Sequence, residues 1–406
     1  MKKANKAKCQ LCKNISVAQL LDLGEQPVTN RFLHGHGDSE YTYPMRVGQC
    51  EICAAVQLID PVPAGELLPR FDWITYNEPE DHIEKLSEVI SLLPGLNKDA
   101  LISGVSFKDD STLARLKARG FSRIYRLDAQ NDLGIQETRA GAETIQARLT
   151  EQKAREIASK HGLQDLVIAR HILEHAQEIP EFLQALKTLV KPQGFILLEV
   201  PDCSRALEKY DYTTLWEEHT VYFTPETFKN CFPYHGLSLL QFACYPYLFE
   251  NVLTAILRPD EKLSQANFSL AGFDGEKNRM IKYCKGLPRK TLTFKELILK
   301  YRQDGKRIAV FGAGHLAAAF INLLSLGDCI DLVIDDNPHK QGLFMPGSRL
   351  PISGSGALLE QNVKLCLLGF SPEKEDKVIQ KNQKFTEDGG IFASIFPASK
   401  YYLKNE

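Results

Sequence analysis

Two pairs of cysteines carry the clearest chemical signal in this sequence. Cys9 and Cys12 form one C-x-x-C knuckle, and Cys50 and Cys53 form a second one. Two such knuckles can present four thiolates to one tetrahedral ion, and a closed four-thiolate shell leaves no open position for catalysis. We therefore predict a structural zinc site that holds a small N-terminal module together. The alternative is two unrelated redox or free-thiol pairs, although neither pair lies in a thioredoxin-like βαβ setting.

A histidine preceded by two carboxylates is the second candidate: Glu217, Glu218 and His219 lie in the segment YDYTTLWEEHTVYFTPETF. Thr224 and Pro225 are a good N-cap and first residue of a helix, so the histidine falls in the loop or strand before that helix. An imidazole whose tautomer and pKa are set by a neighbour can serve as a general base. An exposed histidine in a polar loop is the alternative, and composition alone favours it.

The segment SGVSFKDD, residues 103–110, follows an apolar run and precedes a helical one, which is the layout of a cofactor-binding loop. It has a single glycine, whereas a loop that cradles a cofactor normally has two or three. Ligands of open α/β sheets bind beyond the carboxyl ends of the strands. The residues that end or follow the predicted strands are therefore candidate cofactor contacts: Gly104, Ser106, Asp109, Asp110, Asp128, Arg170 and His171.

Asp128 is the candidate ribose ligand within this set, because it ends the predicted strand RIYRLD. A carboxylate at that position can accept hydrogen bonds from both ribose hydroxyls of an adenosine cofactor. An acidic residue that ends a strand can also be a helix cap or a solvated side chain, so both interpretations stay open.

Near the C-terminal end, VFGAGHLAAAF places Gly312, Gly314 and Ala317 in the spacing of a dinucleotide-binding fingerprint. Asp335 and Asp336 end the next predicted strand, where an acidic residue contacts the ribose in such sites. Taken alone, this pattern suggests bound NAD.

Strands and helices that position these residues alternate from about residue 77 to residue 258. ALISGV, RIYRLD, DLVIAR and GFILLEV have the pattern of strands, and DSTLARLKARG, ETIQARLTEQKAREIASKHG and EIPEFLQALKTLV that of helices. We expect βαβ units and a mostly parallel, doubly wound sheet. We further expect Gly194 to supply a positive φ before a buried strand, helices over 281–304 that break around 286–288, and a second α/β unit from Arg307 onward.

The chain has 406 residues and a formal net charge of −2. Its length predicts two or three domains, and its balanced charge argues against nucleic acid or an anionic membrane as a partner. No apolar run approaches the roughly 18 residues that span a bilayer, and MKKANKAKCQLCKN lacks the apolar segment of a signal peptide. We expect a cytoplasmic α/β protein that is a monomer or a small homo-oligomer.

Several segments of the chain also resemble known protein families. DLVIARHILEHAQEIPEFLQALKTLVKPQGFILLEVPD closely resembles the fourth strand, fourth helix and fifth strand of class I S-adenosylmethionine-dependent methyltransferases. The whole chain resembles the zinc-containing sugar C-methyltransferases of deoxysugar biosynthesis nearly end to end. The segments that carry this resemblance are the four cysteines, LGEQPVTNRF, YPMRVGQCEICAAVQL, LEH, EVPD, Glu218-His219, Tyr222-Phe223 and VIDDNPHKQGLFMPGSRLPI. It implies a zinc module over 1–75, a methyltransferase domain over 76–295 and a Rossmann-like domain over 296–406.

The resemblance implies methyl transfer from S-adenosylmethionine to a carbon beside the keto group of a nucleotide-linked 4-keto-deoxysugar. A base removes the proton alpha to the carbonyl, and nearby donors stabilise the enolate. The family's Glu-His pair falls on Glu218 and His219, which makes His219 the base. Tyr76 and His171 become substrate or enolate contacts. The resemblance also indicates residues that bind or enclose the nucleotide-sugar, partly at a helix N-terminus that faces anionic groups: Tyr222, Gly312, Gly314, His315 and Asp336.

Two departures from the family pattern leave alternatives open. Trp216 stands where relatives have a tyrosine, and its indole N–H is not an acid–base phenol. SGVSFKDD replaces the family's acidic-x-Gly-x-Asn-Asp-Gly loop. Lys108 would repel the sulfonium and ammonium of S-adenosylmethionine, whereas Asp109 or Asp110 could hold the ammonium. The alternatives are a sugar-nucleotide enzyme without methyl transfer, of an isomerase or NAD-using type, and a catalytically inactive partner protein.

Overall fold

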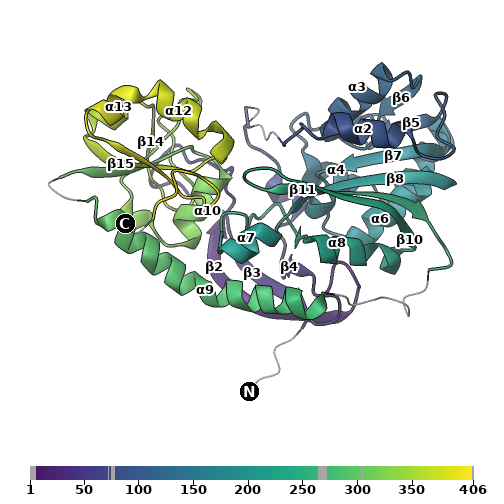
Figure 1. The fold of residues 1–406 in the computed structure, drawn as a ribbon, viewed down its shortest axis with the longest axis horizontal. Coiled ribbons are helices and arrows are strands. Elements are labelled where there is room, and N and C mark those ends of the chain that lie inside the picture. Colours follow the sequence, from purple (N-terminus) through teal and green to yellow (C-terminus); the bar gives the residue numbers. More distant parts are fainter. Residues whose placement is uncertain (1–5, 72, 75–77, 264–271, 303–304, 405–406) are drawn as a thin grey trace.

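A computed structural model describes residues 6–71, 73–74, 78–263, 272–302 and 305–404. Tyr76, one of the predicted catalytic residues, lies outside these ranges. The strands of the described residues form three sheets, and in Figure 1 the C-terminal sheet and the central sheet lie at opposite ends of the molecule. None of the described helices is long and apolar enough to span a membrane.

The N-terminal part forms an antiparallel sheet in the order β1-β2-β3-β4-β9. A one-turn helix, α1 (Ala64–Leu67), follows the fourth strand. The strands are β1 (Ala7–Lys8), β2 (Ile15–Pro27), β3 (Thr42–Cys50), β4 (Val56–Leu58) and β9 (Val221–Tyr222). The last strand comes from the middle of the chain, where Tyr222 pairs with Val56. The N-terminal module is therefore tied by its own sheet to the segment that follows His219.

The central sheet has six strands in the order β10-β11-β8-β7-β5-β6, and the four from β8 to β6 are parallel, as the sequence predicts. β10 and β11 form an antiparallel hairpin at one edge. The strands are β5 (Leu101–Gly104), β6 (Arg123–Arg126), β7 (Gln164–Arg170), β8 (Val190–Asp202), β10 (Leu237–Tyr245) and β11 (Asn251–Pro259). The parallel strands bring the ends of β5 and β7 together at one edge of the sheet.

Helices cover both faces of this sheet (Figure 1). On one face, Leu86 and Leu116 pack with Ile102 and Leu197; on the other, Leu183 packs with alternate residues of the same strands. The helices are α2 (Ile83–Ser91), α3 (Asp110–Ala118), α4 (Ala142–Arg148), α5 (Glu151–His161), α6 (Ile179–Leu189), α7 (Ser204–Lys209) and α8 (Pro225–Cys231), with short 3-10 turns at Phe107–Asp109, Leu173–His175 and Phe232–His235.

The structure corrects two local predictions for this region and confirms a third. The helix predicted over 143–162 is two helices, because Thr150 caps α5 by accepting a hydrogen bond from the Lys153 N–H while Leu149 is fully buried. Gly194 has no positive φ. It is needed instead for close packing, because a Cβ there would lie 2.6 Å from Val190 and 3.0 Å from two carbonyl oxygens of the neighbouring chain segment. The Thr224 N-cap is confirmed.

Helix α9 (Phe273–Leu299) contradicts the predicted break around residues 286–288. It is one continuous helix of 27 residues with Pro288 inside it, and Figure 1 shows it running along the base of the molecule to the C-terminal domain. Tyr212 donates a hydrogen bond of 2.6 Å to the Tyr283 carbonyl, and a Cβ on Gly286 would lie 2.4 Å from the Tyr210 ring. Tertiary packing therefore outweighs the local cost of proline and glycine in a helix.

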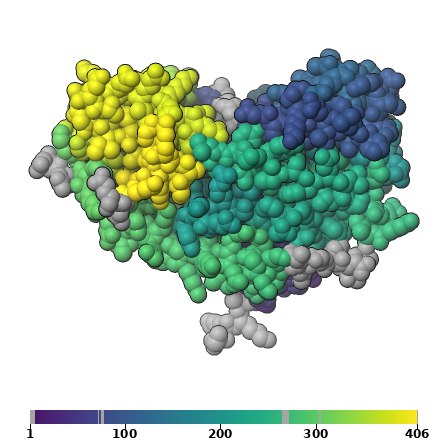
Figure 2. Space-filling model, in the orientation of Figure 1, coloured from purple at the N-terminus to yellow at the C-terminus, as the bar shows by residue number. Residues whose placement is uncertain are grey.

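The C-terminal domain is a parallel sheet in the order β14-β13-β12-β15-β16, which confirms the second α/β unit. Its strands are β12 (Arg307–Phe311), β13 (Leu332–Ile334), β14 (Ile352–Ser353), β15 (Val363–Leu368) and β16 (Ile391–Ser394). Its helices are α10 (His315–Leu323), α11 (Ala357–Glu360), α12 (Glu375–Lys381) and α13 (Gln383–Glu387), with 3-10 turns at Gly327–Cys329 and Pro372–Lys374. Figure 2 shows a notch between this domain, in yellow, and the blue and teal residues of the central part.

Candidate active site

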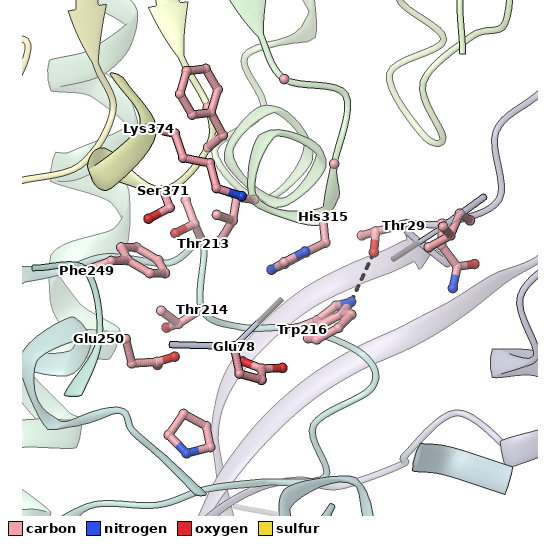
Figure 3. Close-up of a pocket in the computed structure, with 18 of the residues that line it drawn as sticks. Thr29, Glu78, Thr213, Thr214, Trp216, Phe249, Glu250, His315, Ser371 and Lys374 are labelled. Carbon is pink, nitrogen blue, oxygen red and sulfur yellow. Dashed lines mark hydrogen bonds between the residues drawn. The ribbon is translucent and has the colours of Figure 1, made fainter. Parts of the chain in front are cut away.

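A cavity of about 560 Å³ lies where the three parts of the chain meet. Each part supplies some of its wall: Asn30 comes from the N-terminal module, His171 and His219 from the central domain, and Gly312 and His315 from the C-terminal domain. Figure 3 shows several of the lining side chains. The volume is in the range of a small-molecule site. A site assembled from distant segments and lined by histidines is the candidate active site.

The four predicted zinc ligands lie together and are buried, with ligand atoms within 4.8 Å of one another. Cys9 Sγ lies 3.5 Å from Cys53 Sγ, and Cys12 Sγ lies 3.6 Å from Cys50 Sγ. Zn–S bonds of about 2.3 Å in a tetrahedron require sulfur atoms about 3.8 Å apart, so the cluster fits zinc. The Cys50 sulfur also accepts N–H groups of Ile52 and Cys53, which favours a thiolate.

The loop that carries His219 is held by the side chains of Thr29 and Asn30, which follow β2. Thr29 Oγ1 donates a hydrogen bond of 2.8 Å to Glu217 Oε1 and accepts one of 3.1 Å from the Trp216 indole, the dashed line in Figure 3. Asn30 Nδ2 donates one of 3.1 Å to Glu218 Oε1. The zinc-bearing module therefore positions the predicted catalytic loop.

His219 lies in the cavity wall beside other aromatic side chains. Its ring is 4.8 Å from that of His175 and nearly perpendicular to it, and 4.9 Å from that of Trp216. Burial, and next the nearby His175, hold the pKa of His219 well below its usual range. The imidazole is therefore neutral at physiological pH and has a lone pair to accept a proton.

Glu218, the residue before His219, does not line the cavity, whereas His219 does. Burial, together with the negative charges of Glu143 and Glu217, raises its pKa well above the usual value. Glu143 in turn lies 3.0 Å from His175 Nδ1. Glu143 and Glu218 therefore lie close to His175, whose ring is next to that of His219.

His171 lines the cavity from the end of β7 and has a φ of 45°, a left-handed conformation that is uncommon for a residue with a side chain. Its Nε2 lies 3.0 Å from Glu199, and its Nδ1 lies 3.4 Å from Glu174 and 4.0 Å from Glu78. Burial alone would lower the pKa of His171, but the attraction of Glu78 and the other carboxylates outweighs it and raises this pKa to about 10. A fixed positive charge therefore faces the cavity.

The C-terminal domain contributes the loop between β12 and α10. Gly312, Gly314 and His315, three of the predicted substrate contacts, line the cavity, and the His315 ring stacks on Trp216 at 4.3 Å. Asp336 does not line it, because its carboxylate accepts the Ser355 N–H and pairs with Lys381. The remaining predicted contact, Tyr222, is buried in the first sheet, where its hydroxyl donates to the Trp216 carbonyl.

Asp335 lines the cavity instead of its neighbour. Its carboxylate accepts a hydrogen bond of 2.9 Å from the Ala313 N–H and pairs with Lys340 at 3.0 Å. The group that would contact a dinucleotide ribose is thus engaged within its own loop. The structure gives the suggestion of bound NAD no support.

The loop after β5 is closed on itself. Asp109 is fully buried, and its carboxylate accepts hydrogen bonds of 2.8 Å from the N–H groups of Val105, Ser106 and Arg170. A Cβ on Gly104 would lie 2.7 Å from the Asp109 Cβ, so the single glycine is needed for this internal contact. The carboxylate that could have held a ligand bridges the ends of β5 and β7.

Apart from His171, which lines the cavity, the other predicted cofactor contacts are also engaged, and none of them lines the cavity. The Arg170 guanidinium is buried, pairs with Glu199 at 2.8 Å and donates to the Lys108 carbonyl. Asp110 pairs with Arg126 at 2.5 Å. Asp128 is exposed and caps its own turn by accepting the Asn131 N–H.

Three cavity or near-cavity residues were missed as site residues. His175 and Asn30 lie in the LEH and LGEQPVTNRF segments, so the resemblance offered a signal for both. Glu250, between β10 and β11, lines the cavity and has no local sequence signal. Only the fold brings this carboxyl group to the site.

Comparison with family models assigns all three parts of the chain. Residues 9–67 match a zinc binding domain model, residues 108–241 a methyltransferase domain model, and residues 277–397 the C-methyltransferase C-terminal domain model. The chain is also 25% identical to the C-methyltransferase NovU of Streptomyces niveus, over 96% of its own length and 95% of that protein.

Solved methyltransferases match less than half of the chain. One from Anabaena variabilis is 15% identical, with a TM-score of 0.27, and the match covers 43% of this chain and 83% of that one. The magnesium protoporphyrin IX methyltransferase of Synechocystis is 12% identical, with a TM-score of 0.30 and coverage of 45% and 83%. The three consecutive domain matches and the end-to-end similarity to NovU show a methyltransferase that is similar, over nearly its whole length, to C-methyltransferases with an N-terminal zinc-binding module.

Proposed function

We propose that this C-methyltransferase acts on a nucleotide-linked keto-deoxysugar, at the carbon beside the keto group, and that His219 is the base that removes the proton from that carbon. The observation that carries the proposal is a neutral, partly exposed imidazole in a cavity shared by all three parts of the chain. A base with a depressed pKa is suited to abstracting a proton from a carbon acid only where the resulting enolate is stabilised.

Positive charge supports the enolate in the central domain. His171 carries its charge at the cavity wall, and Lys108 forms an ion pair with Glu78 in the same region. A cation near a developing oxyanion lowers the energy of the transition state because the water-poor site screens charge weakly. These groups favour a substrate whose reacting end carries a carbonyl oxygen.

The nucleotide end of the substrate fits the opposite wall. Gly312 and Gly314 precede α10, whose first residue, His315, lines the cavity. Lys374 and Lys340, which pairs with Asp335, line the same wall. Helix N-termini and lysines are suited to a diphosphate. The cavity therefore offers a cationic end for a nucleoside diphosphate and a histidine end for a keto sugar.

The methyl donor implied by the methyltransferase domain is S-adenosylmethionine. The residues predicted to hold it do not fit it as they stand, because Asp109, Asp110 and Arg170 are paired within the protein. When bound, the donor would supply the electrophilic methyl group. The residues of this chain account for the preceding steps, in which the sugar is held, the proton is removed and the enolate is stabilised.

The proposal is tested by incubating the full chain with a nucleoside-diphosphate 4-keto-6-deoxyhexose and S-adenosylmethionine and weighing the product by mass spectrometry. We expect a product that is heavier by the mass of one CH2 unit, because a methyl group replaces a hydrogen atom on the alpha carbon. We expect no product with His219→Ala. A chain that binds no nucleotide-sugar, or a methyl group found on oxygen or nitrogen, would refute the proposal.

A further inference from the structure

Glu250 lies directly before β11 in the loop of the β10–β11 hairpin and lines the cavity, yet none of the steps above uses it. In Figure 3 its carboxyl group points into the cavity toward Glu78, and in this view Glu78 lies between Glu250 and Trp216. We propose that Glu250 is the general acid that donates a proton to the keto oxygen of the substrate while His219 removes the alpha proton. This inference rests on the proposed function.

The backbone around Glu250 is held in place from two other elements. Arg205 of α7 donates hydrogen bonds of 2.7 and 2.8 Å to the carbonyls of Tyr247 and Leu248, and its second nitrogen donates one of 2.6 Å to Asn251 Oδ1. Asn251 donates one of 3.1 Å to Asp202. A catalytic group needs such fixed support, because a small displacement of the reacting atoms costs much of the rate.

The surroundings of Glu250 favour its protonated form. Three carboxylates face it from other elements, namely Glu78 ahead of α2, Asp202 at the end of β8 and Glu174 after β7, and one cation, His171, opposes them. Burial first, and then Glu78, raise the pKa of Glu250 to about 8. The described residues give its carboxyl group no hydrogen bond. The proton is therefore present near neutral pH and available to a ligand.

The two groups complement each other chemically. The C–H bond alpha to the carbonyl breaks, its proton goes to the His219 nitrogen, and its electron pair forms the carbon–carbon double bond. The carbonyl π electrons move to oxygen, which takes the proton of Glu250 and leaves a carboxylate. When the carbonyl re-forms, the oxygen returns that proton to Glu250. Environments that push the pKa values of two groups in opposite senses are typical of an acid–base pair.

His171 differs from Glu250 in this respect. Its imidazolium nitrogens face Glu174 and Glu199, which hold its proton in place. It can stabilise the enolate oxygen by its charge, whereas Glu250 can transfer a proton to it. The two roles predict different dependence on pH.

Hydrogen exchange in D₂O without a methyl donor isolates this step. The probe is the nucleoside-diphosphate 4-keto-6-deoxyhexose, and mass spectrometry follows deuterium entering the alpha carbon. We expect Glu250→Ala to slow exchange by about 100-fold, in the range of general acid–base catalysis, with an unchanged Kd for the nucleotide-sugar. Glu250→Gln keeps an N–H donor and should retain more activity. Glu88→Gln, an exposed change on α2, is the matched control and should stay within about twofold.

The pH profile gives the second readout. Exchange by the natural chain should decline above about pH 8, where Glu250 loses its proton, and this decline should be absent in Glu250→Gln. Exchange by Glu250→Ala within about threefold of the natural rate, or a decline that persists in Glu250→Gln, would overturn the assignment.

A measurement that needs no turnover separates this inference from the proposed function. The difference between infrared spectra of the ligand-free natural chain and of Glu250→Gln, followed across pH 6 to 10, should show a protonated carboxyl band that disappears near pH 8. Absence of the band overturns the acid role of Glu250. A band without any exchange of nucleotide-sugar protons refutes the proposed function instead.

Discussion

Asn30 Nδ2 donates a hydrogen bond of 3.1 Å to Oε1 of Glu218, so a side chain of the zinc-binding module contacts the residue next to the candidate base, His219. Together with the pairing of β4 and β9, this contact makes the zinc module part of the active-site framework. It explains why a closed, structural metal site accompanies a methyltransferase domain. Zinc bound by the four cysteines would hold the two knuckles together, and the strands next to the knuckles position the loop that carries His219.

Removing a zinc ligand should therefore affect both stability and catalysis. We expect Cys50→Ser to reduce the bound zinc from about one ion per chain to well below one, since a four-thiolate site loses a quarter of its ligands. The thermal midpoint should fall and activity should decrease with it. Metal analysis and thermal denaturation measure these changes. Cys366→Ser is the control, because that thiol is buried in the C-terminal domain away from the cluster. A zinc-free natural chain purified without chelators would contradict the prediction.

His219→Ala should lower the rate of alpha-proton removal by about 100-fold or more while leaving nucleotide-sugar affinity within a few-fold. The pH dependence of activity follows from the lowered pKa of His219. The base works when unprotonated, and because its pKa lies well below the usual value, activity should stay level from pH 7 to below the ordinary histidine pKa and decline only under more acidic conditions. A decline centred near pH 6.5 would show that another group is the base.

Thr29→Val tests the positioning of the loop. The variant keeps the shape of the side chain but removes the hydrogen bond that Thr29 Oγ1 accepts from the Trp216 indole and the one that it donates to Glu217. We expect a loss of about 1–3 kcal/mol in the free energy of unfolding, the usual cost of a buried polar group that loses its partner. Urea denaturation measures it. Thr29→Ser, which keeps the hydroxyl, should behave as the natural chain, and equal losses in both variants would contradict the hydrogen-bond explanation.

S-adenosylmethionine should bind the ligand-free chain weakly, with a Kd above about 1 mM, because the Asp109 carboxylate and the Arg170 guanidinium are already paired. Isothermal titration calorimetry with its homocysteine product avoids turnover during the measurement. A Kd in the low micromolar range for the chain alone would show that the loop after β5 opens without cost. Repeating the titration with bound nucleotide-sugar tests whether the substrate makes the donor site available.

Much of the architecture follows from local sequence. The spacing of Cys9, Cys12, Cys50 and Cys53 specifies the metal cluster because each knuckle needs only a tight turn. Alternating apolar strands and amphipathic helices specify two α/β units because burial requires that periodicity. The helix over 273–299 could not be predicted in this way, since its continuity through Gly286 and Pro288 depends on packing against Tyr210 and Tyr212.

The sequence by itself determined the cysteine cluster, the α/β units and the Glu218-His219 pair, because each is encoded by residue types at short spacing. Only the tertiary structure decided what those residues face. It closes Asp109 onto Val105 and Arg170, and it brings Glu250 to the cavity from a hairpin at the sheet edge. The physical reason is that hydrogen-bond partners, burial and pKa depend on groups far apart in the chain, which become neighbours only when the three parts of the chain pack around one cavity.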